Sequence, residues 1–114
     1  DLATRDTIAR PSLEAAIAWL MVLDGGTSQL QVNQRLMIEG RATVGRGHEC
    51  DVVIDDPSVS TVHAAVYFVT AHWVVEDYES MNGTYASGKP VTSVAVVNNG
   101  DLLQFGRVRM RMLC

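Results

Sequence analysis

The sequence has few cysteines, few basic residues and no long apolar run. Its 114 residues include two cysteines, Cys50 and Cys114, and carry nine Lys and Arg against 13 Asp and Glu, which gives a net charge of −4. Two isolated cysteines form neither a disulfide framework nor a zinc-binding pattern, so we expect a reducing, cytoplasmic compartment. The acidic balance argues against broad nucleic-acid binding, which needs a basic surface, but it allows a small local anion site.

The longest apolar run, residues 15–23, is far shorter than the ~20 apolar residues of a membrane-spanning helix. No signal peptide is visible either, so we expect no membrane insertion. No residue pattern calls for a metal or another cofactor, because the spacing of the two cysteines suggests no zinc site and His63 has no acidic, Cys or His partner at ligand spacing. The chain is therefore expected to be a soluble protein that needs no metal or cofactor.

The length fits one globular domain, and 47% hydrophobic residues can supply its core. Residues 1–18 are expected to form an N-terminal tail or linker. Residues 13–18 could add one or two helical turns behind Pro11, since proline is tolerated at a helix start. The folded domain is expected to span residues 19–114.

From Trp19 onward, short apolar or alternating runs recur between Gly, Asn and Asp turn signals. Such spacing indicates an all-β sandwich or barrel. The predicted strands are residues 19–23, 30–32, 35–38, 42–44, 52–54, 64–69, 73–77, 84–86, 94–96, 102–105 and 108–113.

The last predicted strand alternates apolar residues with arginines. Val108, Met110 and Met112 should face the core, and a row of arginines, Arg107, Arg109 and Arg111, should face outward. This row could bind anions, but we favour a solvated strand face whose charges discourage edge-to-edge pairing.

Three predicted loops carry polar motifs that say little when each is taken alone. Gly45 and Gly47 flank Arg46, whose planar fork of donors suits phosphate oxygens. Ser60 precedes His63 by three residues, and a serine hydroxyl can donate one hydrogen bond to an anion. His63 could be a general base or a metal ligand, but we favour a buried histidine that braces a loop.

The third motif is Asn82-Gly83-Thr84, and the three motifs together are specific. Arg46, Ser60-x-x-His63 and Asn82-Gly83-Thr84 occur in the order found in the forkhead-associated (FHA) domain family, which this chain resembles. Residues 42–46, 50–57, 73–77 and 99–106 are similar to that family's strands and turns. The resemblance covers residues 19–113.

The resemblance implies a non-catalytic β-sandwich of two mostly antiparallel sheets, with recognition loops at one end that bind phosphothreonine peptides. It implies phosphate contacts for Arg46 and Ser60, with Thr61 beside them, and a contact from Asn82 to the peptide backbone. It gives a loop-structuring role to four further residues, Gly45, His63, Gly83 and Thr84.

Three features bear on specificity. Thr61 stands where the family commonly has a basic or polar residue, so a hydroxyl is kept without an added charge. Met81 stands where Thr or Ser is common, so a side-chain hydroxyl is lost. Residues 55–59, which include Ser58 and Val59, match the loop that in the family helps to select the residue three after the phosphothreonine. They contain no Lys or Arg, which argues against a strong preference for an acidic residue at that position.

The expected partner is a protein phosphorylated by a Ser/Thr kinase, in signalling or assembly, or the chain's own tail phosphorylated at Thr4 or Thr7. One alternative is a scaffold of the same fold that binds its partner without phosphate. Another is an enzyme with a nucleophilic Cys50 and His48 or His63 as its base, which would need the base within about 3 Å and a third group to orient it. Because residues 48 and 50 lie two apart in a predicted turn that enters a strand, we favour a Cys50 that packs as a small apolar residue.

Overall fold

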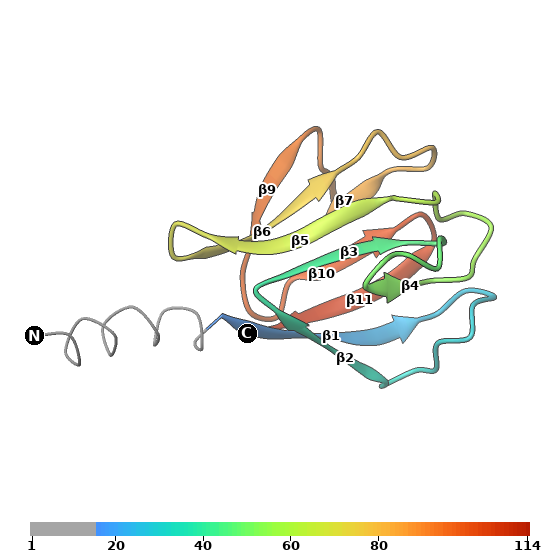
Figure 1. Cartoon of the computed structure of the whole chain (residues 1–114), viewed down its shortest axis with the longest axis horizontal. Helices are drawn as coiled ribbons and strands as arrows, with labels where there is room; N and C mark the ends of the chain where they lie inside the picture. Colours follow the sequence, from blue (N-terminus) through green and yellow to red (C-terminus); the bar gives the residue numbers. More distant parts are fainter. Residues whose placement is uncertain (1–15) are drawn as a thin grey trace, which may run out of the picture.

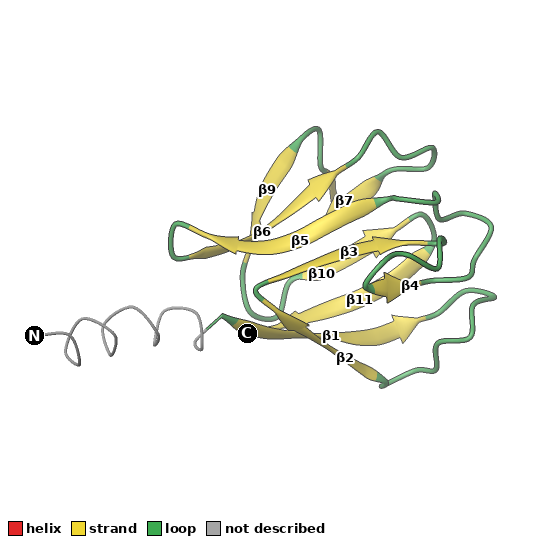
Figure 2. Ribbon diagram, in the orientation of Figure 1, coloured by secondary structure: helices red, strands yellow, loops and turns green. Residues whose placement is uncertain are grey.

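The computed structural model describes residues 16–114, which form two packed β-sheets (Figures 1 and 2). The six-stranded sheet has the spatial order β2 (Arg35–Glu39), β1 (Ile17–Asp24), β11 (Val108–Leu113), β10 (Leu102–Phe105), β7 (Thr84–Ala86) and β8 (Lys89–Pro90). The five-stranded sheet has the order β4 (Val52–Val53), β3 (Arg41–Gly45), β5 (Ala64–Val69), β6 (His72–Asp77) and β9 (Val94–Val97). All pairings are antiparallel except β3 with β4, so the predicted sandwich is confirmed.

The core lies between the sheets and follows the alternation of the strands. Along β11, Val108, Met110 and Met112 are buried, and along β1 the same holds for Ala18, Leu20 and Val22. The largest fully buried side chains also include Ile38, Ile54, Leu103 and Phe105. Burying a side chain of this size stabilises the fold by about 1.5–3 kcal/mol.

The predicted strands match the observed ones to within about two residues, apart from three differences. Residues 30–32 form no strand, because Asn33 takes a left-handed conformation (φ 72°) and the Gln31 N–H donates to the Gln34 side chain. The short strand β8 was not predicted; it contains Pro90 and exists through its pairing with β7. The helix expected over residues 13–18 is wrong for Ile17 and Ala18, which belong to β1, and residues 13–15 lie outside the described part.

Arg107, Arg109 and Arg111 were expected to form an outward row that protects a sheet edge, and the structure confirms only part of this. Arg109 and Arg111 project from the outer face of β11, but β11 lies between β1 and β10, so their charges guard no sheet edge. Arg107 precedes the strand and forms an ion pair with buried Asp56 at 2.9 Å. Arg109 lies 3.8 Å from Asp24, and Arg111 donates to the Gly100 carbonyl, so the row is not an open anion-binding stripe.

The topology brings three loops to one end of the sandwich. The β3–β4, β4–β5 and β6–β7 connections all lie at the end away from the C-terminus, the right-hand end in Figure 1. These connections carry Arg46, Ser60 and Asn82. Residues 16–114 include no helix long and apolar enough to span a membrane.

Candidate functional site

The three loops enclose a hollow of about 330 Å³. Its lining contains one cation and no carboxylate: Arg46, Pro57, Ser58, Val59, Ser60, Thr61, Met81 and Asn82. The structure therefore brings together the residues expected to contact a phosphopeptide, with Ser58, Val59 and Met81 beside them. The four residues expected to shape the loops, Gly45, His63, Gly83 and Thr84, do not line the hollow.

Arg46 is exposed, and its main chain and stem are fixed. Its N–H donates to the Ser60 carbonyl at 2.9 Å, and its Nε donates to the Val59 carbonyl at 3.0 Å. Within residues 16–114 the two Nη groups make no hydrogen bond or ion pair. The guanidinium thus keeps its outer donors for a ligand, and these donors suit phosphate oxygens.

Gly45 is required by the approach of the neighbouring loop. A Cβ at this position would lie 2.3 Å from the Thr61 carbonyl oxygen and 2.9 Å from the Cys50 sulfur. The Thr61 carbonyl accepts hydrogen bonds from the Gly47 N–H and the Cys50 thiol. The Arg46 loop is therefore packed directly on the loop that carries Ser60, and Thr61 as a whole residue remains exposed.

Ser60 connects two of the loops. Its hydroxyl oxygen accepts a hydrogen bond from the Met81 N–H at 3.0 Å, and its own N–H donates to His63 Nδ1 at 3.0 Å. A hydroxyl has one hydrogen to donate, and within residues 16–114 that hydrogen has no acceptor. Met81 has no side-chain hydroxyl to contribute to the site. Its main-chain N–H nevertheless orients the hydroxyl of Ser60.

His63 is fully buried and bridges two loops. Its Nδ1 accepts from Ser60, so its Nε2 carries the hydrogen that is donated to the Gly83 carbonyl at 2.8 Å. Its ring packs edge-on against Phe105, with 5.9 Å between ring centroids. Burial lowers the pKa of His63 below 6.5, although the Gly83 hydrogen bond and the charge of Asp77 oppose this shift.

Asn82 is exposed at the rim of the hollow. One amide hydrogen is donated to the Ser58 carbonyl at 2.9 Å, and the rest of the amide is unpaired within residues 16–114. The next residue, Gly83, has φ of +88°, a left-handed conformation that favours glycine. The turn therefore holds the asparagine beside the hollow and leaves its Oδ1 available for a ligand.

Asp77 braces the β6–β7 loop, which carries Asn82, and the sequence motifs did not indicate this role. Its carboxylate accepts hydrogen bonds from the hydroxyls of Ser80 at 2.6 Å and Thr84 at 2.7 Å, and Thr84 is buried. The Ser80 hydroxyl in turn accepts from the Gly83 N–H at 3.0 Å. These hydrogen bonds outweigh the effect of burial, which alone would raise the pKa of Asp77, and hold it below its usual value. The Asp-x-x-Ser spacing, typical of side-chain-capped turns, was the available signal.

The geometry gives Cys50 no catalytic base. The buried thiol donates to the Thr61 carbonyl at 3.3 Å, and both ring nitrogens of His63 have other partners. Burial, with the nearby charge of Glu49, raises the pKa of Cys50. His48 is exposed and makes no hydrogen bond to the thiol. No group of three His, Cys, Asp or Glu in residues 16–114 is arranged to hold a metal ion.

A β-sandwich with an arginine, a serine and an asparagine grouped on its end loops defines a class of anion-recognition module, and the comparisons with known proteins assign the family. The FHA domain family model matches residues 42–106, so the chain belongs to the FHA domain family.

Known relatives cover nearly the whole chain. The glycogen accumulation regulator GarA of Mycobacterium tuberculosis is 33% identical over 119 residues, covering 98% of this chain and 73% of GarA. The oxoglutarate dehydrogenase inhibitor of Corynebacterium efficiens is 33% identical over 102 residues, covering 90% of this chain and 69% of the relative. Among solved structures, Mycobacterium tuberculosis EmbR in complex with a low-affinity phosphopeptide has the same fold, with a TM-score of 0.76 and 21% identity, over 98% of this chain and 28% of EmbR.

Proposed function

We propose that this chain binds a phosphothreonine-containing segment of a partner protein and does no chemistry of its own. The observation that carries this proposal is the position of the Arg46 guanidinium and the Ser60 hydroxyl on one hollow, both with donors unused within residues 16–114. Membership of the FHA domain family supports the same ligand class.

In the proposed complex, the Arg46 Nη groups donate to two phosphate oxygens and the Ser60 hydroxyl donates to a third. Thr61 is an exposed residue of the lining beside them, and its hydroxyl can add a weaker contact. Because Arg46 is the one cation of the lining and no carboxylate lies there, the phosphate meets attraction without a repelling charge. Asn82 accepts a main-chain N–H of the peptide through its Oδ1, while its amide nitrogen stays on the Ser58 carbonyl.

The surface beside the phosphate position favours uncharged neighbours of the phosphothreonine. Met81 is 86% exposed, and Pro57 and Val59 add apolar lining. The Ser58 hydroxyl donates to Asp56 and accepts from the Arg107 N–H, and Arg107 is itself paired with Asp56, so neither residue adds a free charge beside the hollow. We therefore expect apolar or small residues to be preferred over acidic ones in the bound segment.

The names of two relatives, a regulator of glycogen accumulation and an inhibitor of oxoglutarate dehydrogenase, support a regulatory role that works through protein binding. The isolated thiol of Cys50 supports a binding module in preference to an enzyme. Both cysteines are free thiols, which supports a cytoplasmic site of action. The proposed self-binding threonines, Thr4 and Thr7, lie outside the described residues.

The test is a titration with one peptide in three forms, carrying phosphothreonine, phosphoserine or threonine, selected from a phosphothreonine peptide library. Calorimetry should give binding for the first form, weaker binding for the second and none for the third. Equal affinity for the phosphorylated and unphosphorylated threonine peptides would instead support the phosphate-independent scaffold. A chain phosphorylated at Thr4 or Thr7 should lose affinity for the external peptide if the tail occupies the site.

A further inference from the structure

A buried carboxylate ties together three loops that lie far apart in the sequence. Asp56, which is 0% exposed, accepts hydrogen bonds from the N–H and hydroxyl of Thr27 at 2.8 and 3.2 Å, and from the N–H and hydroxyl of Ser58 at 2.8 and 2.7 Å. Thr27 belongs to the β1–β2 loop, and Ser58 lies in the β4–β5 loop beside the hollow. The carboxylate thus anchors the site loop to a segment outside the site.

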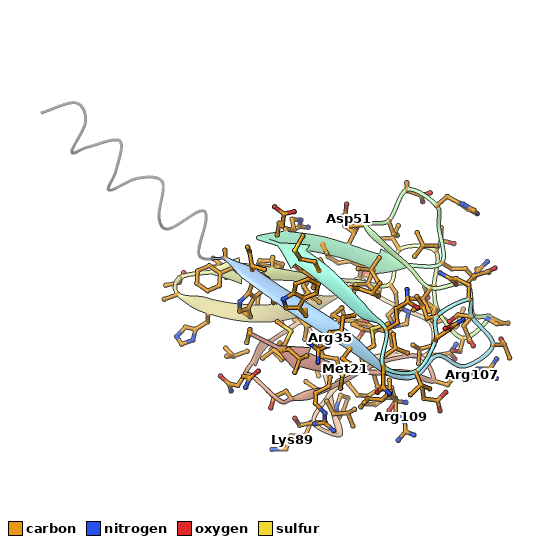
Figure 3. All side chains as sticks on the ribbon, turned by 90° about the horizontal axis from the view of Figure 1, so that it is seen from below. Met21, Arg35, Asp51, Lys89, Arg107 and Arg109 are labelled. Atoms are coloured by element: carbon orange, nitrogen blue, oxygen red, sulfur yellow. The ribbon has the colours of Figure 1, made fainter. Side chains whose placement is uncertain are left out.

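Arg107, from the β10–β11 turn, completes this arrangement. Its Nε lies 3.1 and 2.9 Å from the two carboxylate oxygens of Asp56, its Nη2 donates to the Thr27 hydroxyl at 3.1 Å, and its main-chain N–H donates to the Ser58 hydroxyl at 3.0 Å. Figure 3 shows Arg107 at the loop end of the molecule, beyond Arg109. We call Thr27, Asp56, Ser58 and Arg107 the loop clamp.

The cost of burying the Asp56 charge is offset by these donors. Burial alone would raise the pKa of Asp56, but the hydrogen bonds from Thr27, Ser58 and Arg107 outweigh it and hold the pKa well below its usual range. The carboxylate is therefore charged at neutral pH and needs its cationic partner, because an unpaired buried charge is strongly unfavourable.

The loop clamp leads directly to the two residues proposed to hold the ligand. The Ser58 carbonyl accepts from the Asn82 side chain at 2.9 Å, and the Val59 carbonyl accepts from Arg46 Nε at 3.0 Å. The Val59 N–H donates to the Asp56 carbonyl at 2.9 Å. Any movement of residues 56–59 would therefore displace both carbonyls, and with them the side chains of Asn82 and Arg46.

We propose that Asp56 and Arg107 are positioning residues for ligand binding: their ion pair fixes the Ser58 and Val59 carbonyls, which in turn orient Asn82 and Arg46. This inference rests on the proposed function and extends it to a residue, Arg107, that does not line the hollow. Its consequence is that removing a cation outside the pocket weakens phosphopeptide binding through geometry.

The experiment compares Arg107→Ala with Arg109→Ala. The second variant removes a nearby exposed arginine, which lies 3.8 Å from the carboxylate of Asp24. At a temperature where both variants are fully folded by circular dichroism, Arg107→Ala should bind the phosphothreonine peptide about fivefold more weakly than wild type, or about 1 kcal/mol. Arg109→Ala should bind within about twofold of wild type. Equal affinities for the two variants and wild type would overturn the inference.

Two further measurements separate positioning from a simple loss of stability. In the Asn82→Ala background, Arg107→Ala should cost less affinity than in wild type, because the two side chains act through the same carbonyl. In the unliganded protein, the NMR signals of the Asn82 amide and the Arg46 Nε–H should shift in Arg107→Ala and stay in place in Arg109→Ala. Unchanged NMR signals, or strictly additive losses, would contradict the clamp. If wild type binds no phosphopeptide, the proposed function fails, and the NMR comparison still decides whether the clamp orients these two side chains.

Discussion

The Met81 main-chain N–H donates a hydrogen bond to the Ser60 hydroxyl oxygen at 3.0 Å. This contact joins the β6–β7 loop to the β4–β5 loop at the edge of the hollow. It occupies one lone pair of the hydroxyl and leaves the hydroxyl hydrogen to donate. A methionine can hold this position because the contact uses its main chain, while its side chain remains 86% exposed beside the site.

Replacing Ser60 with alanine should therefore weaken phosphothreonine-peptide binding by about tenfold or more, because a hydrogen bond to a charged group is worth about 1.5–3 kcal/mol. The melting temperature should change little, since the Met81 N–H is exposed to water once the hydroxyl is removed. Calorimetry and thermal unfolding measure the two effects. Ser60→Thr keeps a hydroxyl and should restore part of the affinity; an alanine variant that binds like wild type would remove Ser60 from the phosphate site.

Arg46 should contribute through the shape of its guanidinium as well as its charge. Arg46→Ala should lower the affinity for the phosphothreonine peptide more than Arg46→Lys, and the lysine variant should still bind more weakly than wild type. A lysine keeps the charge, but it loses both the fork and the Nε bond to the Val59 carbonyl. The control is Arg41→Ala, which removes an exposed arginine that lies at the opposite end of β3 from Arg46 and donates to the Tyr78 hydroxyl. Wild-type affinity in Arg46→Lys would mean that charge alone is recognised.

The fold could be predicted from the sequence because its strands alternate clearly, as β11 does. The exceptions are short segments whose structure is set by distant partners. Residues 17 and 18 have neighbours that favour a helix, yet they pair with Glu39 and Ile38 of β2. Lys89 and Pro90 form a strand only because Tyr85 and Ala86 lie opposite them.

The candidate site divides in the same way. Arg46, Ser60 and Asn82 lie in local motifs with recognisable spacing, so the sequence could indicate them. The supporting pair Asp56 and Arg107 is separated by 51 residues, and no local spacing links them. The alternation of the last strand suggested an outward arginine at position 107, whereas the turn before β11 directs it to a buried carboxylate. A pair so far apart in the chain leaves no local pattern in a single sequence.

Cys50 and Cys114 should differ in their reactivity toward iodoacetamide. Cys50 is 7% exposed, its thiol donates to the Thr61 carbonyl, and burial raises its pKa, so little reactive thiolate is available. Cys114 is exposed and should react first. Mass spectrometry of the Cys114→Ser variant isolates Cys50, which should be labelled only slowly at neutral pH and quickly in denaturant. Fast labelling in the folded protein would revive the nucleophile hypothesis.

The burial of His63 predicts that the protein loses stability in mild acid. The folded state holds the imidazole neutral, with a pKa below 6.5, because burial disfavours its charged form. As the pH falls through the ordinary histidine pKa of about 6.5, the unfolded chain takes up a proton that the folded protein does not. Above pH 6.5 the free energy of unfolding should therefore keep its highest value. It should decline as the pH falls from 6.5 toward the lowered pKa of His63 in the folded state.

The measurement is the urea midpoint between about pH 7.5 and pH 5, a window above the titration of ordinary carboxylates. The wild-type midpoint should fall across this window. His63→Asn, whose side chain does not titrate, should start from a lower midpoint and show a flatter profile. The double variant His48→Asn/His72→Asn, which removes two exposed histidines, should keep the wild-type slope. The opposite result would be a slope that disappears in the double variant and persists in His63→Asn. The pH dependence would then come from the surface histidines, and the description of His63 as a neutral residue that bridges two loops would be wrong.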